Sequence, residues 1–410
     1  MRDPGAQDRF DVVVVGAGIL GLAVARELRH RYPSLAMVVL ERESDVAQHQ
    51  TGHNSGVIHS GVYYTPGSLK ARMCVEGSKL MYQFCDENEI AYERCGKLIV
   101  ALSQREVAGL DEIERRGRAN NVAGLRRLSA AEIPEVEPGC RGVAALHCPD
   151  TGIVDYHQVS AALARGLREQ GVDIRFATTV TALHRRDAAT EVVTNGGSVH
   201  AKFVVGCAGL WSDRLAVSAG APADPRIVPF RGAYLTLNKS SAPVVRGLVY
   251  PVPNPELPFL GVHVTKLING DVVLGPTAML VLARDAYRVA TARWGDVRDI
   301  VTWPGTWKMA KKFWRTGVSE VMMAVQRERL VRAAAEYVPA VGVLGVRENV
   351  SAGVRAQALS SDGALVDDFV LSETPGALHV RNAPSPAATS SLALAREIVD
   401  RIQGSRDWSF

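Results

Sequence analysis

The chain has 410 residues, of which 47% are hydrophobic and 22% charged, an ordinary globular mix that excludes a disordered, coiled-coil or collagen-like chain. Its formal net charge of +4 is too small for a general nucleic-acid binder, which would need a basic face or stripe. The length predicts two or three domains that can bury a sizeable core.

A strand, a glycine turn, a helix and a second strand are predicted at the start of the chain. The valine run at 12–15 is typical of a buried parallel strand, and residues 20–28 have the pattern of an amphipathic helix. LAMVVL at 35–40 predicts the second strand and completes a β-α-β unit. The turn has the spacing G-x-G-x-x-G, formed by Gly16, Gly18 and Gly21.

This unit predicts a dinucleotide site. The first glycine permits the tight turn, the second lets a pyrophosphate approach the backbone, and the third lets helix and strand pack closely. The phosphates then lie at the helix N-terminus, where unpaired N–H groups favour an anion. Glu41 follows at the usual spacing of about 20 residues, would bind the adenosine ribose, and argues against NADP. FAD and NAD share this fingerprint.

Three further segments of small and polar residues suit a long cofactor that lies extended. They are TGHNSGVIHSGVYY from Thr51, VVGCAGLWSDRLA at 204–216 and HVRNAPSPAATSS at 379–391. With the glycines and Glu41, the expected cofactor contacts are Arg42, Thr51, His53, Asn54, Ser55, Gly56, Val180, Ala208, Gly209, Trp211, Asn382 and Ser385.

Two stretches differ from this nucleotide-binding pattern and predict one second domain, inserted twice. The cofactor domain is then discontinuous, and the class is α/β. We expect a Rossmann-like cofactor domain at 10–85, 149–225 and 341–404, and a substrate domain at 86–148 and 226–340.

Ten ordered segments between residues 10 and 401 resemble the L-2-hydroxyglutarate dehydrogenase/oxidase family, of the FAD-dependent D-amino-acid oxidase and glycine oxidase type. They include GAGILGLA, TGHNSGVIHSGVYY, CGKLIVA, CAGLWSDR and GVRAQAL. The resemblance implies non-covalent FAD, a largely antiparallel sheet in the substrate domain, and hydride transfer from the α carbon of L-2-hydroxyglutarate to the flavin, which yields 2-oxoglutarate. It leaves open whether oxygen or a membrane quinone then takes the electrons.

A 2-hydroxy dicarboxylate needs cationic partners, and the arginine fork suits a carboxylate. Arg231 and Arg355 are the candidates, and the resemblance of Gly-Val-Arg to a Gly-Leu-Arg-Pro segment of amino-acid oxidases places Arg355 on the α-carboxylate. For the base, strand alternation sets His263 opposite two valines, and His59 is the second candidate. Tyr250 is expected to line the pocket. With an unperturbed histidine, flavin reduction falls below about pH 6–6.5.

Other features give weaker expectations. Six cysteines without a Cys-x-x-Cys pair and a polar N-terminus predict reduced thiols in the cytoplasm. The sequence has no cluster of cysteines and histidines, so no metal site is expected. Lys70 is expected on a solvated helix face. Trp303, Trp307 and Trp314 lie among basic residues at 302–317, which predicts either a helix packed on the substrate domain or one that rests on the inner face of a membrane.

Two rival functions remain open at this point. One is an FAD-dependent amino-acid or amine oxidase of the same fold. The other is a non-catalytic nucleotide-binding module. The convergence of Arg231, His263 and Arg355 on the second domain argues against the module.

Overall fold

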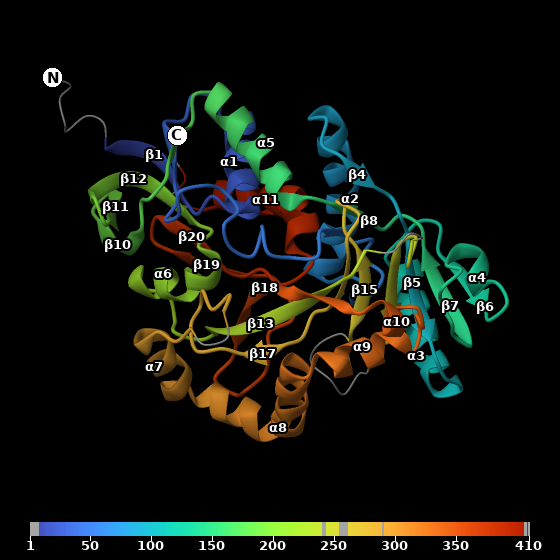
Figure 1. The fold of residues 1–410 in the computed structure, drawn as a ribbon. Coiled ribbons are helices and arrows are strands. Elements are labelled where there is room, and N and C mark those ends of the chain that lie inside the picture. Colours follow the sequence, from blue (N-terminus) through green and yellow to red (C-terminus); the bar gives the residue numbers. More distant parts are fainter. Residues whose placement is uncertain (1–7, 240–242, 254–260, 289–290, 406–407, 409–410) are drawn as a thin grey trace. The chain divides into compact units, whose positions relative to one another are not determined.

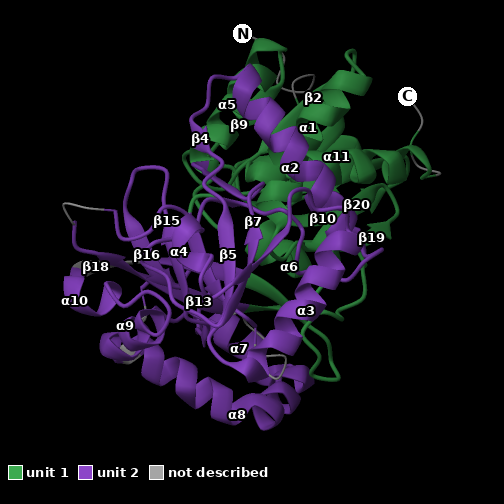
Figure 2. Ribbon diagram, turned by 90° about the vertical axis from the view of Figure 1, so that its right-hand side faces the viewer, with its two compact units in different colours: residues 1–52, 156–228, 356–410 green, residues 53–155, 229–355 purple. Residues whose placement is uncertain are grey.

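The computed structural model describes residues 8–239, 243–253, 261–288, 291–405 and 408 (Figure 1). The chain forms two compact units: unit 1 comprises Met1–Gly52, Tyr156–Val228 and Ala356–Phe410, and unit 2 comprises His53–Asp155 and Pro229–Arg355 (Figure 2). Residues 53–85, which the sequence assigned to the cofactor domain, pack within unit 2. That packing follows from β3 (Val57–Ile58), which pairs with β8 (Gly152–Val154) of the same unit.

Unit 1 is built on a mainly parallel sheet with the strand order β10-β11-β12-β1-β2-β9, and β20 extends it beside β12. β1, β2, β9, β12 and β20 run parallel to their neighbours in this central part, whereas the pairs β10–β11, β11–β12 and β19–β20 are antiparallel. The strands are β1 (Arg9–Val15), β2 (Met37–Leu40), β9 (Asp173–Arg175), β10 (Val180–Arg186), β11 (Ala189–Thr194), β12 (Gly197–Gly206), β19 (Val370–Thr374) and β20 (Ala377–Asn382).

The predicted β-α-β unit is present as β1, α1 (Ile19–Arg31) and β2. Valines 12–15 and all of β2 are buried, because helices cover a sheet of this kind on both faces. α1 packs against α5 (Tyr156–Glu169) and α11 (Ala387–Gln403). The short helices η1 (Gly209–Trp211) and α6 (Ser212–Ser218) follow β12.

Unit 2 contains a nine-stranded sheet with the order β17-β13-β16-β15-β14-β5-β7-β6, and β18 pairs with β13. In the described part of the sheet the strand pairs are antiparallel except for β14 with β5, so the expected largely antiparallel sheet is present. Its strands are β5 (Lys97–Ala101), β6 (Arg126–Ser129), β7 (Ala144–Cys148), β13 (Arg226–Leu237), β14 (Leu248–Pro251), β15 (His263–Lys266), β16 (Val272–Gly275), β17 (Met279–Leu280) and β18 (Val346–Leu359).

Unit 2 also has a small sheet, β3-β8-β4, and a set of helices. α2 begins after Ser68, whose hydroxyl accepts a hydrogen bond from the Ala71 backbone N–H, as an N-cap does. The elements are β3 (Val57–Ile58), β4 (Tyr92–Glu93), β8 (Gly152–Val154), α2 (Leu69–Glu87), α3 (Gln104–Ala119), α4 (Ile133–Val136), α7 (Trp294–Thr302), α8 (Pro304–Val325), α9 (Arg327–Ala335) and α10 (Val341–Leu344).

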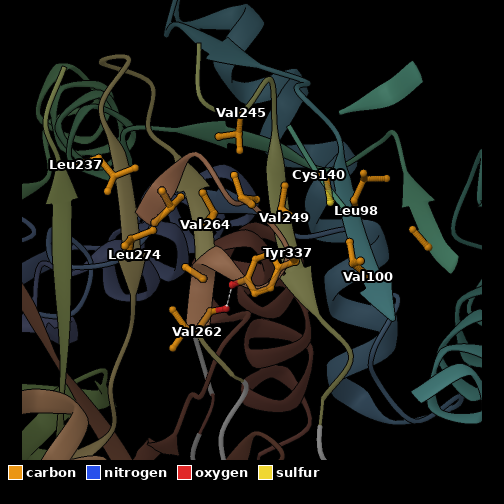
Figure 3. Close-up of a cluster of buried hydrophobic side chains, with 14 of the residues drawn as sticks. Leu98, Val100, Cys140, Leu237, Val245, Val249, Val262, Val264, Leu274 and Tyr337 are labelled. Atoms are coloured by element: carbon orange, nitrogen blue, oxygen red, sulfur yellow. Dashed lines mark hydrogen bonds between the residues drawn. The ribbon is translucent and has the colours of Figure 1, made fainter. Parts of the chain in front are cut away.

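The two faces of the nine-stranded sheet differ in chemistry. Strand register aligns Leu98, Val249, Val264 and Leu274 in one row across β5, β14, β15 and β16. These side chains belong to one buried cluster (Figure 3), in which the Tyr337 hydroxyl donates a hydrogen bond to the Val262 carbonyl oxygen. Because side chains alternate along a strand, the next residues of the same strands lie on the opposite face. That face carries buried polar side chains.

Candidate functional site

The glycine turn of unit 1 contains two glycines that the protein's own backbone requires. Gly16 has a φ of +106°, and a Cβ there would lie 2.5 Å from the Cys207 carbonyl oxygen. A Cβ on Gly21 would lie 2.0 Å from the Gly16 carbonyl oxygen. The backbone packs so closely here, where the turn lies between β1, β12 and α1, that neither position has room for a side chain.

Gly18 is different, because within the described part of the chain a Cβ there would meet only the Thr51 hydroxyl oxygen, at 3.4 Å. The missing side chain therefore serves no packing contact within the chain. Gly18 is the N-cap of α1 and has no side chain to cap the helix. An open backbone at a helix N-terminus is what a pyrophosphate needs to approach, so the turn fits a dinucleotide.

Glu41 lies beside this turn at the end of β2. It is 7% exposed, and its carboxylate accepts hydrogen bonds from the backbone N–H groups of Ala17, at 2.6 Å, and Glu43, at 2.9 Å. A carboxylate offers about four acceptor positions, so acceptor capacity remains for ribose hydroxyls. Thr51 is held at the same turn, where its hydroxyl accepts from the Ile19 N–H at 3.2 Å.

Arg42 and Trp211 form a second part of this region in unit 1. The Arg42 guanidinium carbon lies 3.9 Å from the centroid of the Trp211 ring. Trp211 is the last residue of η1, which begins at Gly209 directly after Ala208, and β12 precedes this segment beside β1. The carboxyl ends of parallel strands meet at one sheet edge, which is where doubly wound folds bind ligands.

The remaining predicted contacts in unit 1 lie farther along the chain. Val180 follows Thr178, whose N–H donates to the Glu41 carbonyl oxygen at 2.8 Å, so this segment passes beside β2. Asn382 is 2% exposed and binds backbone atoms of Ala358, Val366 and Asp368. Ser385 is exposed and precedes α11. Asn382 thus fixes neighbouring loops.

The segment from His53 to Gly56 lies in unit 2. The Asn54 side chain accepts a hydrogen bond from the Gly56 N–H at 2.8 Å, and a Cβ on Gly56 would lie 2.6 Å from the Val154 carbonyl oxygen. A Cβ on Gly353 would lie 2.1 Å from the His53 carbonyl oxygen. The Gly-Val-Arg segment therefore crosses this turn closely.

Arg355 is linked to this turn through Tyr234. The Tyr234 hydroxyl is hydrogen-bonded with both Arg355 and Ser55, while burial raises the pKa of Tyr234. A predicted cofactor residue and the predicted carboxylate-binding arginine therefore share a partner. The guanidinium also acts electrostatically on Tyr250 and His263.

Tyr250 and His263 are stacked on the polar face of the sheet. Their ring centroids lie 3.6 Å apart, with an angle of 9° between the planes. The two residues are 2% and 7% exposed, and Tyr250 is hydrogen-bonded with Thr265. Among the residues that the structure describes, none forms a hydrogen bond with the buried Nε2 of His263. An orphaned imidazole nitrogen of this kind fits a ligand-binding site.

Both candidate bases are neutral at physiological pH. Burial lowers the pKa of His263 well below its ordinary value, and the positive charges of Arg355 and Lys97 lower it further. Burial, Lys97 and Lys70 lower the pKa of His59 to about 3. The expectation that flavin reduction falls near pH 6–6.5 assumed an unperturbed histidine, and the lowered pKa values contradict that assumption.

Arg231 is 6% exposed, and its Nε donates a hydrogen bond to the Tyr287 carbonyl oxygen at 3.1 Å. Burial lowers its pKa. The charges that shift the pKa of His263 include Arg355 and Lys97, but not Arg231. Thus the structure groups His59, Tyr250, His263 and Arg355, while Arg231 is hydrogen-bonded to Tyr287, whose ring centroid lies 4.3 Å from that of His53.

Two lysines in this region are buried, which the sequence did not indicate. Lys70, expected in solvent, is 6% exposed in α2, because it belongs to the buried side of the helix. Lys97, in β5, is 2% exposed, and its Nζ lies 4.6 Å from the Tyr63 ring centroid and 5.3 Å from that of Tyr250. The available sequence signal was a single lysine at the start of an otherwise apolar strand, KLIVA.

The described helices include none that is long and apolar enough to cross a bilayer. In the same part of the chain, no three His, Cys, Asp or Glu side chains are grouped as a metal site would require. All six cysteines are present as thiols.

Comparison with known proteins assigns the chain to a family. The model of the family "FAD dependent oxidoreductase" matches residues 11–401. The chain is 45% identical to the mitochondrial L-2-hydroxyglutarate dehydrogenase of Nematostella vectensis, over 96% of this chain and 90% of the relative. It is 44% identical to the human mitochondrial enzyme of that name, over 96% and 89%. The L-2-hydroxyglutarate dehydrogenase of Indibacter alkaliphilus is 40% identical, over 95% and 98%.

Solved structures show the same fold. The dithionite-reduced L-α-glycerophosphate oxidase of Mycoplasma pneumoniae, with FAD bound, superimposes with a TM-score of 0.79 at 25% identity, over 98% of this chain and 95% of that one. The glycine oxidase of Geobacillus kaustophilus gives a TM-score of 0.73 at 18% identity, over 97% and 96%. With its open glycine turn, its Glu41 carboxylate and its match over nearly the whole length, the chain belongs to the FAD-dependent oxidoreductase family and, within it, to the L-2-hydroxyglutarate dehydrogenases.

Proposed function

We propose that this protein oxidises L-2-hydroxyglutarate to 2-oxoglutarate with non-covalently bound FAD. The main structural support is the buried Nε2 of His263, which has no hydrogen-bond partner in the described chain. Burial and the positive charges of Arg355 and Lys97 keep this imidazole neutral. Relatives at 40–45% identity have this activity in their names, whereas the glycine oxidases among the structural neighbours are 18–19% identical. The identity favours a hydroxyacid over an amine as substrate. A non-catalytic nucleotide-binding module would give no reason for a buried imidazole nitrogen that has no hydrogen-bond partner in the described chain.

In unit 1, the α1 N-terminus at Gly18 would hold the FAD pyrophosphate, and Glu41 would hold the adenosine ribose. The ordering of Thr51 and Arg42 around this turn supports them as further contacts. When bound, FAD supplies the acceptor for the hydride that leaves the substrate α carbon. All other steps fall to the side chains of the protein.

His263 would act as the base. Its Nε2 accepts the proton of the substrate hydroxyl while the α hydrogen leaves with its electron pair, so the α carbon becomes a carbonyl. The stacked Tyr250 ring fixes the orientation of the imidazole. A base must be unprotonated before the reaction, and Arg355 and Lys97 favour that form. Arg355 would also bind the α-carboxylate through its planar fork.

Helix α8 supports a further proposal, peripheral contact with a membrane that could supply a quinone as electron acceptor. Trp303 is buried, as the packing alternative required, but Trp307 and Trp314 are 61% and 60% exposed. From Trp314 an exposed apolar stripe continues through Val318 and Met322 at helical spacing, whereas Trp307 precedes the kink of α8 at Phe313. Exposed basic residues accompany them, namely Lys308, Lys311, Lys312 and Arg315. This combination suits an anionic lipid surface.

The substrate proposal predicts the response of the purified yellow protein. Under anaerobic conditions, L-2-hydroxyglutarate should bleach the flavin absorbance with the formation of one 2-oxoglutarate per flavin. D-2-hydroxyglutarate and L-glutamate should leave the spectrum unchanged. Spectrophotometric titration and chemical analysis of the product check this. Bleaching by L-glutamate alone would establish an amino-acid oxidase instead.

Gly18→Ala should abolish FAD retention while the protein still folds. The added methyl group would occupy the pyrophosphate's path, yet it meets no described protein atom closer than 3.4 Å. Gly166→Ala in α5 is the matched control, since a Cβ there meets nothing within 4 Å. Flavin content per protein and circular dichroism measure the two effects. Normal flavin content in Gly18→Ala would show that the turn does not hold the cofactor.

His263→Asn should retain FAD and slow flavin reduction by about 10²–10⁴-fold, the usual contribution of a general base. In the parent protein, the rate constant for flavin reduction at low substrate concentration should not fall as the pH is lowered through 6.5. Because the pKa of His263 is lowered, the imidazole stays neutral and able to accept a proton until the pH falls much further. Stopped-flow spectroscopy checks both, with exposed His184→Asn as the control. A parental rate in His263→Asn would point to His59.

The α8 surface should bind the protein to vesicles that contain phosphatidylglycerol, but not to vesicles of phosphatidylcholine alone. Trp307→Ala combined with Trp314→Ala should remove this binding, because the aromatic rings would supply the interfacial contact. Val343→Ala changes an exposed apolar residue elsewhere in unit 2 and should bind as the parent does. Vesicle co-sedimentation checks this. Equal binding of the double variant would rule out α8 as the contact.

A further inference from the structure

Lys97 is a buried cation without a carboxylate partner. It is 2% exposed, and among the residues that the structure describes it forms neither an ion pair nor a hydrogen bond. Its contacts are with the faces of the Tyr63 and Tyr250 rings. Burial lowers the pKa of Lys97, because a charge without an anionic partner is costly in a buried position. Buried lysines are normally paired, so this one requires an explanation.

The neighbours of Lys97 supply no negative charge either. Cys74 and Cys148 lie near it, but burial raises the pKa of these thiols to about 12 and about 11, so both are neutral. The Tyr63 hydroxyl is buried, has no hydrogen-bond partner in the described chain, and has a pKa well above its ordinary value. The Lys97 ammonium group and the Tyr63 hydroxyl, both hydrogen-bond donors, thus lie in the same buried region.

This position belongs to the same sheet face as the proposed base. The register pairs Lys97 with Leu248 and Ile99 with Tyr250, so Lys97 and Tyr250 point to the same side of the sheet. Tyr250 in turn stacks on His263. Both Lys97 and Arg355 lower the pKa of His263. Two cations therefore act on the imidazole that would receive the substrate proton.

We propose that Lys97, with the Tyr63 hydroxyl, binds the substrate carboxylate distant from the reacting carbon, while Arg355 binds the α-carboxylate. A dicarboxylate has a charge of −2 and needs one cationic partner at each end. Lys97 is then the residue that selects a dicarboxylate over a monocarboxylate. This inference rests on the proposed oxidation of L-2-hydroxyglutarate and adds to it the determinant of chain-end specificity.

The test compares L-2-hydroxyglutarate with L-2-hydroxyvalerate, which has the same carbon chain without the distal carboxylate. In the holoenzyme, Lys97→Met should lower kcat/KM for L-2-hydroxyglutarate by about 10- to 150-fold, as expected for a lost charge-assisted hydrogen bond. Its kcat/KM for L-2-hydroxyvalerate should change less than threefold. Arg355→Ala should lower kcat/KM for both substrates, because both have the α-carboxylate. Equal losses for both substrates in Lys97→Met would overturn the proposal.

Lys266→Met is the matched control. Lys266 lies in β15 of the same sheet, and its Nζ pairs with Glu93 Oε1 at 2.7 Å near the surface. This variant removes the same charge from the same sheet and should leave the ratio of the two kcat/KM values at the parental figure. A changed ratio in Lys266→Met would show that the general charge of the sheet, and not Lys97, sets the preference.

Binding measurements give a readout that does not require turnover. By calorimetry, Lys97→Met should bind 2-oxoglutarate at least 10-fold more weakly than the parent and bind 2-oxovalerate equally well. Without ligand it should melt at the parental temperature or higher, because an apolar side chain replaces an unpaired buried charge. Parental 2-oxoglutarate affinity in Lys97→Met would refute the role of Lys97. If Lys97→Met does not fold, Lys97→Gln serves the same comparison.

The two hypotheses can fail separately. If the parent protein does not oxidise L-2-hydroxyglutarate, the proposed function fails whatever Lys97 does. If the parent oxidises it and Lys97→Met keeps the parental preference for the dicarboxylate, only the role of Lys97 fails.

Discussion

The alternation of side chains along β5, β14 and β15 is the constraint on which unit 2 depends. One row of residues, exemplified by Val249 and Val264, enters the apolar cluster that contains Tyr337. The adjacent residues must then point to the other face, and there the sequence has Lys97, Tyr250 and His263. The same strands thus supply hydrophobic stability and a polar site. A shift of one strand by one residue would exchange the two faces and destroy both.

Much of unit 1 could be predicted because its signals are local. The valine strand, the glycine spacing and Glu41 lie within about 30 residues, the size of a β-α-β unit. The structure adds a distinction that the motif does not contain. Close contacts within the chain require glycine at positions 16 and 21, whereas a Cβ on the remaining glycine of the motif, Gly18, would meet no described backbone atom within 4 Å.

Unit 2 was less predictable because its site depends on long-range pairing. Residues 53–85 follow the dinucleotide motif directly and have no pattern that shows their packing, yet β3 pairs with β8 about 95 residues later, as in Val57 with Ile153. Similarly, KLIVA is recognisable as a strand, but nothing in it shows that Lys97 lies beside Tyr250. The histidine positions could be guessed from alternation. Their lowered pKa values could not, since these arise from burial and from charges on other elements.

The positive charges around the His263 imidazole would also affect which ligands can bind at this face of unit 2. L-Glutamate differs from L-2-hydroxyglutarate by an ammonium group in place of the hydroxyl. That ammonium would meet Arg355 and Lys97, whose positive charges already disfavour a proton on the neighbouring imidazole. The ammonium group would have to lose a proton before a hydride could leave the α carbon. The proposed base, His263, has a lowered pKa and therefore accepts that proton poorly. With substrate bound at this face as proposed, the electrostatic potential that keeps the imidazole neutral would therefore discriminate against L-glutamate, an amino acid of nearly identical shape, before any steric contact is needed.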